Sequence, residues 1–268
     1  MLKLRILTAL VGAPIALFLA WQGGSLFTGT VAILAFVGWR EYFKLLPLQN
    51  KPNLVQWIGS LGVILFVLNA QGSWMPLEVL LSGSLLILFS LIFFLRRPQA
   101  MPALLFSLAG LIYIGFGFSQ FVLLRNWQLG IQADSGLILL AMVVFATWMN
   151  DSCAYFVGSM IGKNKLCPEI SPAKSWEGAI GGIIGAIGMT TWIGTQFLGL
   201  PLLFLLLLGA LVGIAGILGD LAESGLKRWA GIKDSGAFFP GHGGVLDRMD
   251  SLLFVIPVTC MWLQLFMK

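Results

Sequence analysis

The stretch LLFLLLLGALVGIAGIL, Leu202–Leu218, carries no charged side chain and decides the class of fold. A helix needs about 20 mostly apolar residues to cross the ~30 Å hydrocarbon core of a bilayer. The run is followed at once by GDLAESGLKR, Gly219–Arg228, in which charged residues return. We therefore predict a membrane-spanning helix that leads into a charged segment at one surface of the bilayer.

The rest of the chain repeats this pattern. Of its 268 residues, 58% are hydrophobic and 10% are charged, and the mean hydropathy is +0.94, far above that of a water-soluble domain. We predict an all-α, polytopic membrane helix bundle with about nine transmembrane helices. The predicted spans are Ile6–Trp21, Ser25–Trp39, Leu54–Ala70, Pro76–Leu95, Ala103–Leu124, Gly136–Met149, Ala179–Leu198, Leu202–Leu218 and Leu252–Phe266. The sixth is expected to continue through Asp151 toward Val157.

The distribution of lysine and arginine sets the expected orientation of the bundle. Short loops that are rich in positive charge stay on the cytoplasmic side of a membrane. If the N-terminus is cytoplasmic and the chain crosses at each predicted span, all but two of the 16 basic residues lie on that side, the exceptions being Arg125 and Lys268. We therefore predict a cytoplasmic N-terminus.

Acidic residues are scarce, and they gather in one segment. Of the 11 acidic residues, those between the last two predicted spans are Asp220, Glu223, Asp234, Asp247 and Asp250. Ionisable side chains are expensive in lipid and normally face protein, water or a ligand. Asp151 directly follows an apolar span, and its position fits either a place in this acidic cluster or a structural role.

Two carboxylate pairs in that segment have helical spacing. Asp220 and Glu223 are three residues apart, as are Asp247 and Asp250, and this spacing places side chains on one face of a helix. Hard divalent cations prefer oxygen ligands such as carboxylates. Each pair alone could instead form salt bridges with Lys227, Arg228 and Arg248. The presence of both pairs beside a histidine and glycines favours a cation site.

Other residues nearby suit a phosphate. His242, Gly243 and Gly244 offer backbone N–H groups and conformations closed to residues with a Cβ, although they also fit a plain turn. Positive charge is supplied by Lys227, Arg228, Lys233 and Arg248. In the preceding loop, Lys174 stands just before Ser175, a predicted helix N-cap where backbone donors face an anion.

The glycine run EGAIGGIIGAIG, Glu177–Gly188, is not a nucleotide-binding loop, because no predicted strand precedes it and no Gly-Lys-Ser/Thr follows. Gly178 with Gly182, and Gly181 with Gly185, have the spacing that brings transmembrane helices together. The sequence also lacks the G-x-S-x-G and H-E-x-x-H patterns of serine hydrolases and zinc proteases. Phosphoryl or nucleotidyl transfer fits better, because positioning and electrostatics carry most of that chemistry.

The sequence SGLKRWAGIKDSGAFFPGHGGVLDRMD, Ser224–Asp250, resembles the signature of the phosphatidate cytidylyltransferase (CDP-diacylglycerol synthase) family. ISPAKSWEG, Ile170–Gly178, is similar to a second element of that family, and GDLAES at Gly219–Ser224 fits its lead-in. The resemblance implies the conversion of CTP and phosphatidate to CDP-diacylglycerol and pyrophosphate with Mg²⁺, and it leaves a second metal ion open. It also implies a membrane bundle that often works as a homodimer, and it implies no nucleic acid partner.

The resemblance further implies roles for individual residues. Asp220 and Asp247 would be metal ligands, with Asp250 beside them, and Lys174 and Ser224 would contact substrate phosphates. The charge of CTP and of the lipid head group would be shared by Lys227, Arg228, Lys233 and Arg248. Asp234 would order the loop, and His242, Gly243 and Gly244 would shape the phosphate pocket.

These inferences combine into one expected organisation. Residues 1–268 would form a single membrane domain, in which 1–130 are N-terminal helices for scaffolding or dimerisation and 131–268 hold the catalytic helices and cytoplasmic loops. The active site would lie on the cytoplasmic side of a bacterial-type plasma membrane, where a phosphatidate oxygen attacks the α-phosphorus of CTP in line. Two alternatives remain, namely a polytopic ion-coupled transporter and a CTP-dependent polyprenol kinase, which would transfer the γ-phosphate and release CDP.

Overall fold

The computed structural model describes residues 2–46, 53–95, 100–130, 134–241 and 243–267, with the backbone alone at 2–9, 91–95 and 100. Helices make up most of these residues, and the strands among them form one short hairpin. The predicted all-α class is therefore confirmed. Contacts between Cα atoms divide the chain into two compact units.

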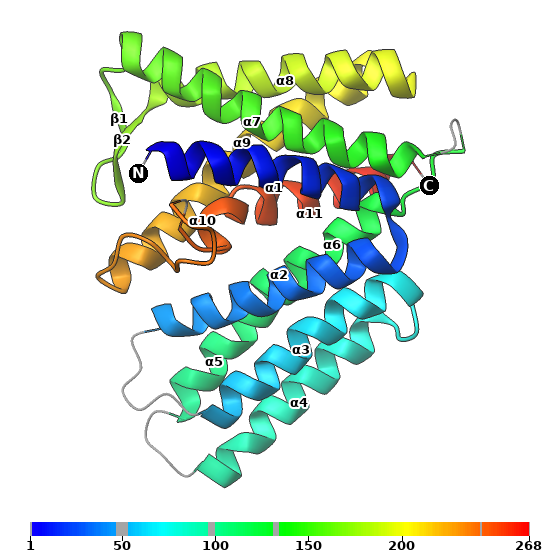
Figure 1. Cartoon of the computed structure of the whole chain (residues 1–268), viewed down its shortest axis with the longest axis vertical. Coiled ribbons are helices and arrows are strands. Elements are labelled where there is room, and N and C mark those ends of the chain that lie inside the picture. The colour runs from blue at the N-terminus through cyan, green and yellow to red at the C-terminus, as the bar shows by residue number, and fades with distance from the viewer. Residues whose placement is uncertain (1, 47–52, 96–99, 131–133, 242, 268) are drawn as a thin grey trace. The chain divides into compact units, whose positions relative to one another are not determined.

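The first unit contains residues Met1–Leu123 and Trp229–Arg248. Its helices are α1 (Leu2–Gln22), α2 (Gly24–Leu45), α3 (Asn53–Gly72), α4 (Leu77–Leu95), α5 (Ala100–Gly110) and the π-helical turn η1 (Leu111–Phe116). Helices α6 (Gly117–Arg125) and α10 (Leu246–Met249) run across its boundary. Helices α2 and α3 lie side by side (Figure 1). The segment Trp229–Arg248, which holds most of the signature, thus belongs with the N-terminal helices.

The core of the first unit is built around Trp39 of α2, which is fully buried. Its indole N–H donates a hydrogen bond of 2.9 Å to the backbone oxygen of Gln56 in α3. A Cβ at Gly59 or Gly110 would meet the Trp39 ring, so both glycines are needed for this close packing. The indole therefore joins α2 to α3 and α5.

The second unit contains residues Leu124–Arg228 and Met249–Lys268. Its main elements are α7 (Ser135–Ile161), β1 (Lys165–Cys167), β2 (Ser171–Ser175), α8 (Trp176–Leu198), α9 (Leu202–Trp229) and α11 (Leu252–Phe266). The strands pair antiparallel, with Lys165 opposite Ser175. Because this hairpin joins α7 to α8, the two helices run alongside each other (Figure 1).

Glycines of α8 bring α8 and α7 close together, as the sequence predicted. A Cβ at Gly181 would meet the side chain of Val157, and one at Gly185 would meet Cys153. A Cβ at Gly182 would lie 2.7 Å from the side-chain oxygen of Asn150. Small residues therefore let this helix pair pack backbone to backbone.

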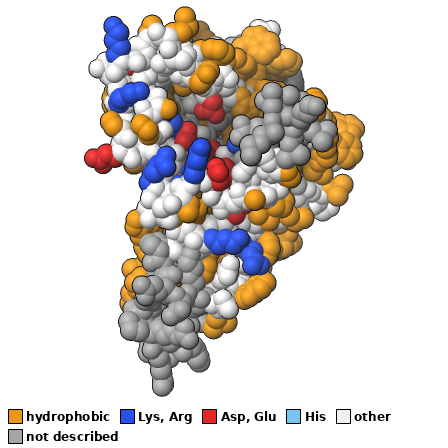
Figure 2. All heavy atoms as spheres, turned by 60° about the vertical axis from the view of Figure 1, so that its left-hand side comes forward, with side chains coloured by type: hydrophobic (Ala, Val, Ile, Leu, Met, Phe, Trp, Pro, Cys, Tyr) orange, Lys and Arg blue, Asp and Glu red, His pale blue; other side chains and the backbone are white. Residues whose placement is uncertain are grey.

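Helix lengths agree with a multi-pass membrane protein. Among the described residues, the helices long and apolar enough to cross a membrane are Asn53–Gly72, Met101–Arg125, Ser135–Ile161, Trp176–Leu198 and Leu202–Trp229. Large hydrophobic side chains such as Leu203 and Ile184 are exposed, and Figure 2 shows wide hydrophobic areas on the surface. The count of about nine spans, the cytoplasmic N-terminus and the single membrane domain stay predictions.

Candidate active site

A pocket of about 430 Å³ lies within the second unit, between α7, the β hairpin, α8 and α9. Its polar lining includes Asn150, Asp151, Tyr155, Lys174, Ser175 and Asp220. The hydroxyl of Ser175 accepts a hydrogen bond of 3.2 Å from the backbone N–H of Gly178, which confirms the predicted N-cap of α8. This cap fixes the end of β2 and thereby the position of the neighbouring Lys174.

Three residues that the sequence singled out meet beside this pocket. The ammonium Nζ of Lys174 lies 2.6 Å from Oδ2 of Asp220. The hydroxyl of Ser224, one turn further along α9, donates a hydrogen bond of 3.1 Å to Oδ1 of Asp220. Both oxygens of this carboxylate are therefore held in place, and strand β2 and helix α9 bring a cation, an anion and a hydroxyl together.

Asp250 and Asp151 belong to the same electrostatic cluster. Burial, together with the negative charges of Asp220 and Asp151, raises the pKa of Asp250 to about 7, although the Ser251 backbone N–H and the Lys227 ammonium act in the opposite direction. The Ser251 N–H donates to Oδ1 of Asp250 at 2.7 Å. Asp151 lines the pocket itself. Of the two roles that the sequence left open for Asp151, the structure therefore favours the one in the acidic cluster.

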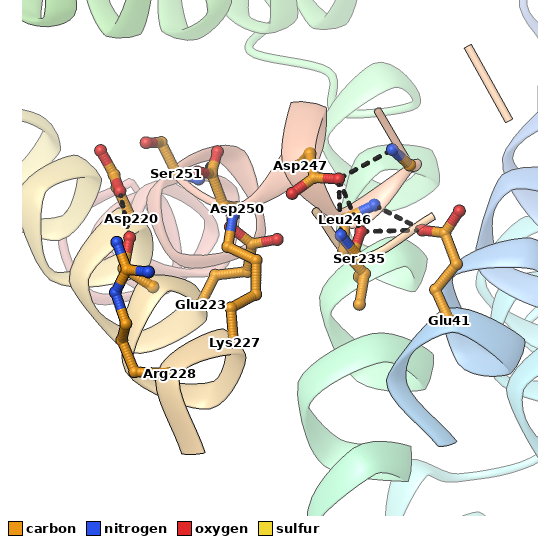
Figure 3. A network of polar contacts seen from close by, with 12 residues as sticks. Glu41, Asp220, Glu223, Lys227, Arg228, Ser235, Leu246, Asp247, Asp250 and Ser251 are labelled. Carbon is orange, nitrogen blue, oxygen red and sulfur yellow. Dashed lines mark hydrogen bonds and ion pairs between the residues drawn. The ribbon is translucent and has the colours of Figure 1, made fainter. Parts of the chain in front are cut away.

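Two of the predicted substrate-binding cations have protein partners. Lys227 lies 2.6 Å from the buried carboxylate of Glu223, one helical turn away. The guanidinium Nε of Arg228 donates a hydrogen bond of 3.3 Å to the backbone oxygen of Ile170 in the hairpin loop. Figure 3 shows the Glu223, Lys227 and Arg228 side chains on α9. The sequence left two roles open for Glu223, a cation ligand or a salt-bridge partner, and the structure shows the salt bridge.

The carboxylate of Asp247 belongs to the first unit and is held by several donors. Its Oδ2 accepts hydrogen bonds from the backbone N–H and hydroxyl of Ser235, both at 2.9 Å, and from the Gly244 N–H at 2.8 Å (Figure 3). Gly243 has a φ of +88°, which favours glycine, and a Cβ there would lie 2.7 Å from Oδ2 of Asp247. Glycine at position 243 therefore lets the loop close on this carboxylate.

The remaining predicted residues of the signature are placed as follows. Lys233, Asp234 and Arg248 have exposed side chains in the first unit. His242 lies outside the described residues. The phosphate roles predicted for these residues, and the pocket-shaping role of Gly243 and Gly244, stay predictions.

Sequence reasoning missed Glu41 of α2 and the pocket residues Asn150 and Tyr155. Glu41 is 4% exposed and accepts a hydrogen bond of 3.0 Å from the Leu246 N–H. An acidic residue that ends an apolar run, as in FVGWRE at Phe36–Glu41, is the signal that could have found it. Asn150 precedes Asp151 and Tyr155 lies four residues after it, so closeness to this acid in the sequence is the signal that could have found them.

The carboxylates of this region are oxygen ligands of the kind that Mg²⁺ prefers, and a magnesium site at these residues stays a prediction. Within the described part of the chain, no three His, Cys, Asp or Glu side chains converge closely enough to hold a metal ion by themselves. Mg²⁺ commonly uses one or two carboxylates, with water and substrate phosphates as the other ligands. Asp250 stays a predicted ligand: burial and the charge of Asp220 raise its pKa, and a bound cation would favour its ionised form. Asp220 and Asp247 fall in different units, so their sharing of a cation stays a prediction.

Comparison with known proteins agrees with the sequence resemblance. Residues 3–266 match the profile of the cytidylyltransferase family. The chain is 38% identical to the phosphatidate cytidylyltransferase of Bacillus subtilis (strain 168), covering 99% of this chain and 98% of that protein. It is 35% identical to the protein of the same name from Staphylococcus epidermidis (strain ATCC 35984), covering 96% and 97%, and 33% identical to that of Staphylococcus saprophyticus, with the same coverage. The chain belongs to the cytidylyltransferase family.

Proposed function

We propose that this protein is a phosphatidate cytidylyltransferase, an enzyme that converts CTP and phosphatidate to CDP-diacylglycerol and pyrophosphate. The observation that carries the proposal is the cluster of Lys174, Asp220 and Ser224 beside a pocket, in a family member built of apolar helices. Such a chain suits a reaction in which one substrate stays in the bilayer and the other arrives from water.

In the proposed reaction, an oxygen of the phosphatidate phosphate forms a bond to the α-phosphorus of CTP. The bond from that phosphorus to the oxygen that bridges to the β-phosphorus breaks, and pyrophosphate leaves with the electron pair. The nucleophile is already anionic at neutral pH, so no strong general base is needed, and the protein contributes positioning and charge stabilisation.

The Lys174 ammonium would turn from Asp220 toward a substrate phosphate, and the Ser224 hydroxyl would donate to a phosphate oxygen. Both groups lie close to the Asp220 carboxylate, at 2.6 and 3.1 Å. Lys227, Arg228, Lys233 and Arg248 would add positive charge to the surroundings of the site. His242, Gly243 and Gly244 would shape the phosphate pocket, and Asp234 would order the loop.

Mg²⁺ would be held by the carboxylates of Asp220, Asp247 and Asp250 together with phosphate oxygens, and a second metal ion would use the same set. Its chemistry would be to neutralise the triphosphate and stabilise the leaving pyrophosphate. We further propose that the site faces the cytoplasm, where CTP is available, in a bacterial plasma membrane, and that the protein works as a homodimer.

The experiment that tests the function uses CTP labelled at one phosphate and identifies the product that carries the label. Purified protein in phosphatidate-containing nanodiscs is given Mg²⁺ and CTP labelled at either the α- or the γ-phosphate. We expect the α-label to enter the lipid and the γ-label to appear in pyrophosphate. Transfer of the γ-label to a lipid would instead identify a kinase, and ion flux into liposomes without nucleotide turnover would identify a transporter.

A further inference from the structure

Glu41 is a buried acidic residue that no part of the proposed reaction uses. It lies in α2 of the first unit and is 4% exposed. A buried carboxylate in a membrane protein is costly unless it is hydrogen-bonded, and it commonly has a functional reason. Its contacts show what it binds.

Among the described residues, Glu41 has hydrogen-bond partners in the signature segment of the first unit. Its Oε2 accepts a hydrogen bond of 3.0 Å from the Leu246 N–H, 205 positions along the chain. The same oxygen lies 3.3 Å from the hydroxyl of Ser235, 194 positions along the chain. Glu41 thus ties α2 to both ends of the loop between Ser235 and Leu246.

Two glycines of the loop leave room for this carboxylate. A Cβ at Gly236 would collide with Oε1 of Glu41, and a Cβ at Gly244 would collide with Oε2. The loop backbone therefore approaches the carboxylate from two sides. This arrangement gives Gly236 and Gly244 a packing role that does not depend on a phosphate.

Glu41 and Asp247 hold the same loop and share one donor. The Ser235 hydroxyl is 2.9 Å from Oδ2 of Asp247 and 3.3 Å from Oε2 of Glu41 (Figure 3). A hydroxyl has one proton, so it can donate to only one carboxylate at a time. Backbone N–H groups of the same loop also bind both carboxylates: Gly244 donates to Asp247, and Leu246 donates to Glu41.

We propose that Glu41 is a positioning residue that orients the Asp247 carboxylate for cation binding. The inference rests on the proposed function, in which Asp247 is a ligand of Mg²⁺. Glu41 fixes the residue before Asp247 through the Leu246 N–H, and it fixes the Ser235 side chain that bonds to Asp247. Partners of this kind, one step removed from a metal, commonly change metal affinity by about 10–100-fold when they are mutated.

The test measures Mn²⁺ binding to the purified full-length protein. Binding is detected as a decrease in the electron paramagnetic resonance signal of free Mn²⁺. The variants are Glu41→Gln, which keeps the shape of the side chain, Glu41→Ala and Asp247→Asn. Glu78→Gln, an exposed glutamate of α4 in the same unit, is the matched control. We expect Mn²⁺ affinity to fall about tenfold or more in Glu41→Ala, to fall less in Glu41→Gln, and to stay unchanged in the control.

The outcomes separate this inference from the proposed function. If Asp247→Asn loses Mn²⁺ affinity while folded Glu41→Gln and Glu41→Ala bind as the wild type does, the positioning role is wrong and the metal role of Asp247 stands. If Asp247→Asn itself binds normally, the metal role fails, and the role of Glu41 fails with it. Should Glu41→Ala not fold, Glu41→Gln decides, since a purely structural role would lower its melting temperature without changing its Mn²⁺ affinity.

Discussion

The ammonium of Lys174 lies 2.6 Å from Oδ2 of Asp220. Each partner has the charge that the other would meet during the proposed reaction, since phosphate is anionic and Mg²⁺ is cationic. In this ion pair the two charges of the partly buried side chains offset each other. Binding would exchange one internal ion pair for two external ones.

Replacing Lys174 by alanine tests this exchange. We expect kcat/KM for CTP to fall by about 100-fold or more, because the lost donor stabilises charge that develops in the transition state. Lys165→Ala is the matched control, since this exposed lysine lies in the other strand of the same hairpin. Equal activities of the two variants in the labelled-CTP assay would exclude a phosphate role for Lys174.

The raised pKa of Asp250 predicts how stability depends on pH. Its ordinary value is 3.8, and burial with nearby negative charge raises it to about 7 in the folded protein. The folded state therefore binds this proton more tightly than the unfolded state, so the contribution of Asp250 favours folding at low pH and is lost as the pH rises through about 7. We expect the melting temperature of Asp250→Asn, relative to that of the wild type, to be higher at pH 8 than at pH 5.5.

Mg²⁺ should reduce the difference in melting temperature between Asp250→Asn and the wild type at pH 8. A bound cation stabilises the ionised carboxylate, so adding Mg²⁺ should raise the melting temperature of the wild type at pH 8 more than that of Asp250→Asn. Thermal unfolding at both pH values, with and without Mg²⁺, measures the effect. If the melting temperatures of the two proteins changed equally with pH, the raised pKa would be wrong. If Mg²⁺ raised both melting temperatures equally, Asp250 would not be a ligand.

Apolar runs predicted the helices well, because the length of hydrocarbon to be crossed sets a minimum length for each run. They predicted some helix ends poorly. Helix α9 continues past the predicted end at Leu218 to Trp229, and the Glu223–Lys227 pair supports this extension beyond the apolar stretch. Lipid no longer limits the helix there, so hydropathy carries no information about its end.

Some residues of the site could be predicted from the sequence and others could not, for a different reason. Lys174, Asp220 and Ser224 came from motifs, and the structure brings them together. The acid at the end of an apolar run marks Glu41 as unusual, but no local pattern can show its contacts, because its partners Ser235 and Leu246 are 194 and 205 positions away. Only the folded first unit brings this acid to the signature loop.

The helix pair that carries Asp151 should be sensitive to a single methyl group. A Cβ at Gly182 would lie 2.7 Å from the Asn150 side-chain oxygen and 3.1 Å from Cβ of Ala154, whereas a Cβ at Gly188 meets nothing within 4 Å. We expect Gly182→Ala to destabilise the protein by about 1–3 kcal/mol through overpacking and Gly188→Ala to be neutral or stabilising. Heating in detergent followed by size-exclusion chromatography measures this, and equal losses would show that α7 and α8 do not pack as described.

A double-mutant cycle on Glu223 and Lys227 separates a structural from a substrate-binding role of Lys227. The Glu223 side chain is fully buried and lies 2.6 Å from the ammonium. Removing one partner of a buried pair leaves an uncompensated charge, which commonly costs about 3–5 kcal/mol, whereas replacing both partners by apolar residues is often neutral. We expect Glu223→Leu and Lys227→Met each to lower the melting temperature, and the double variant to recover most of the loss. If Lys227→Met keeps its melting temperature but loses affinity for CTP, Lys227 serves the substrate and the pair does not stabilise the fold.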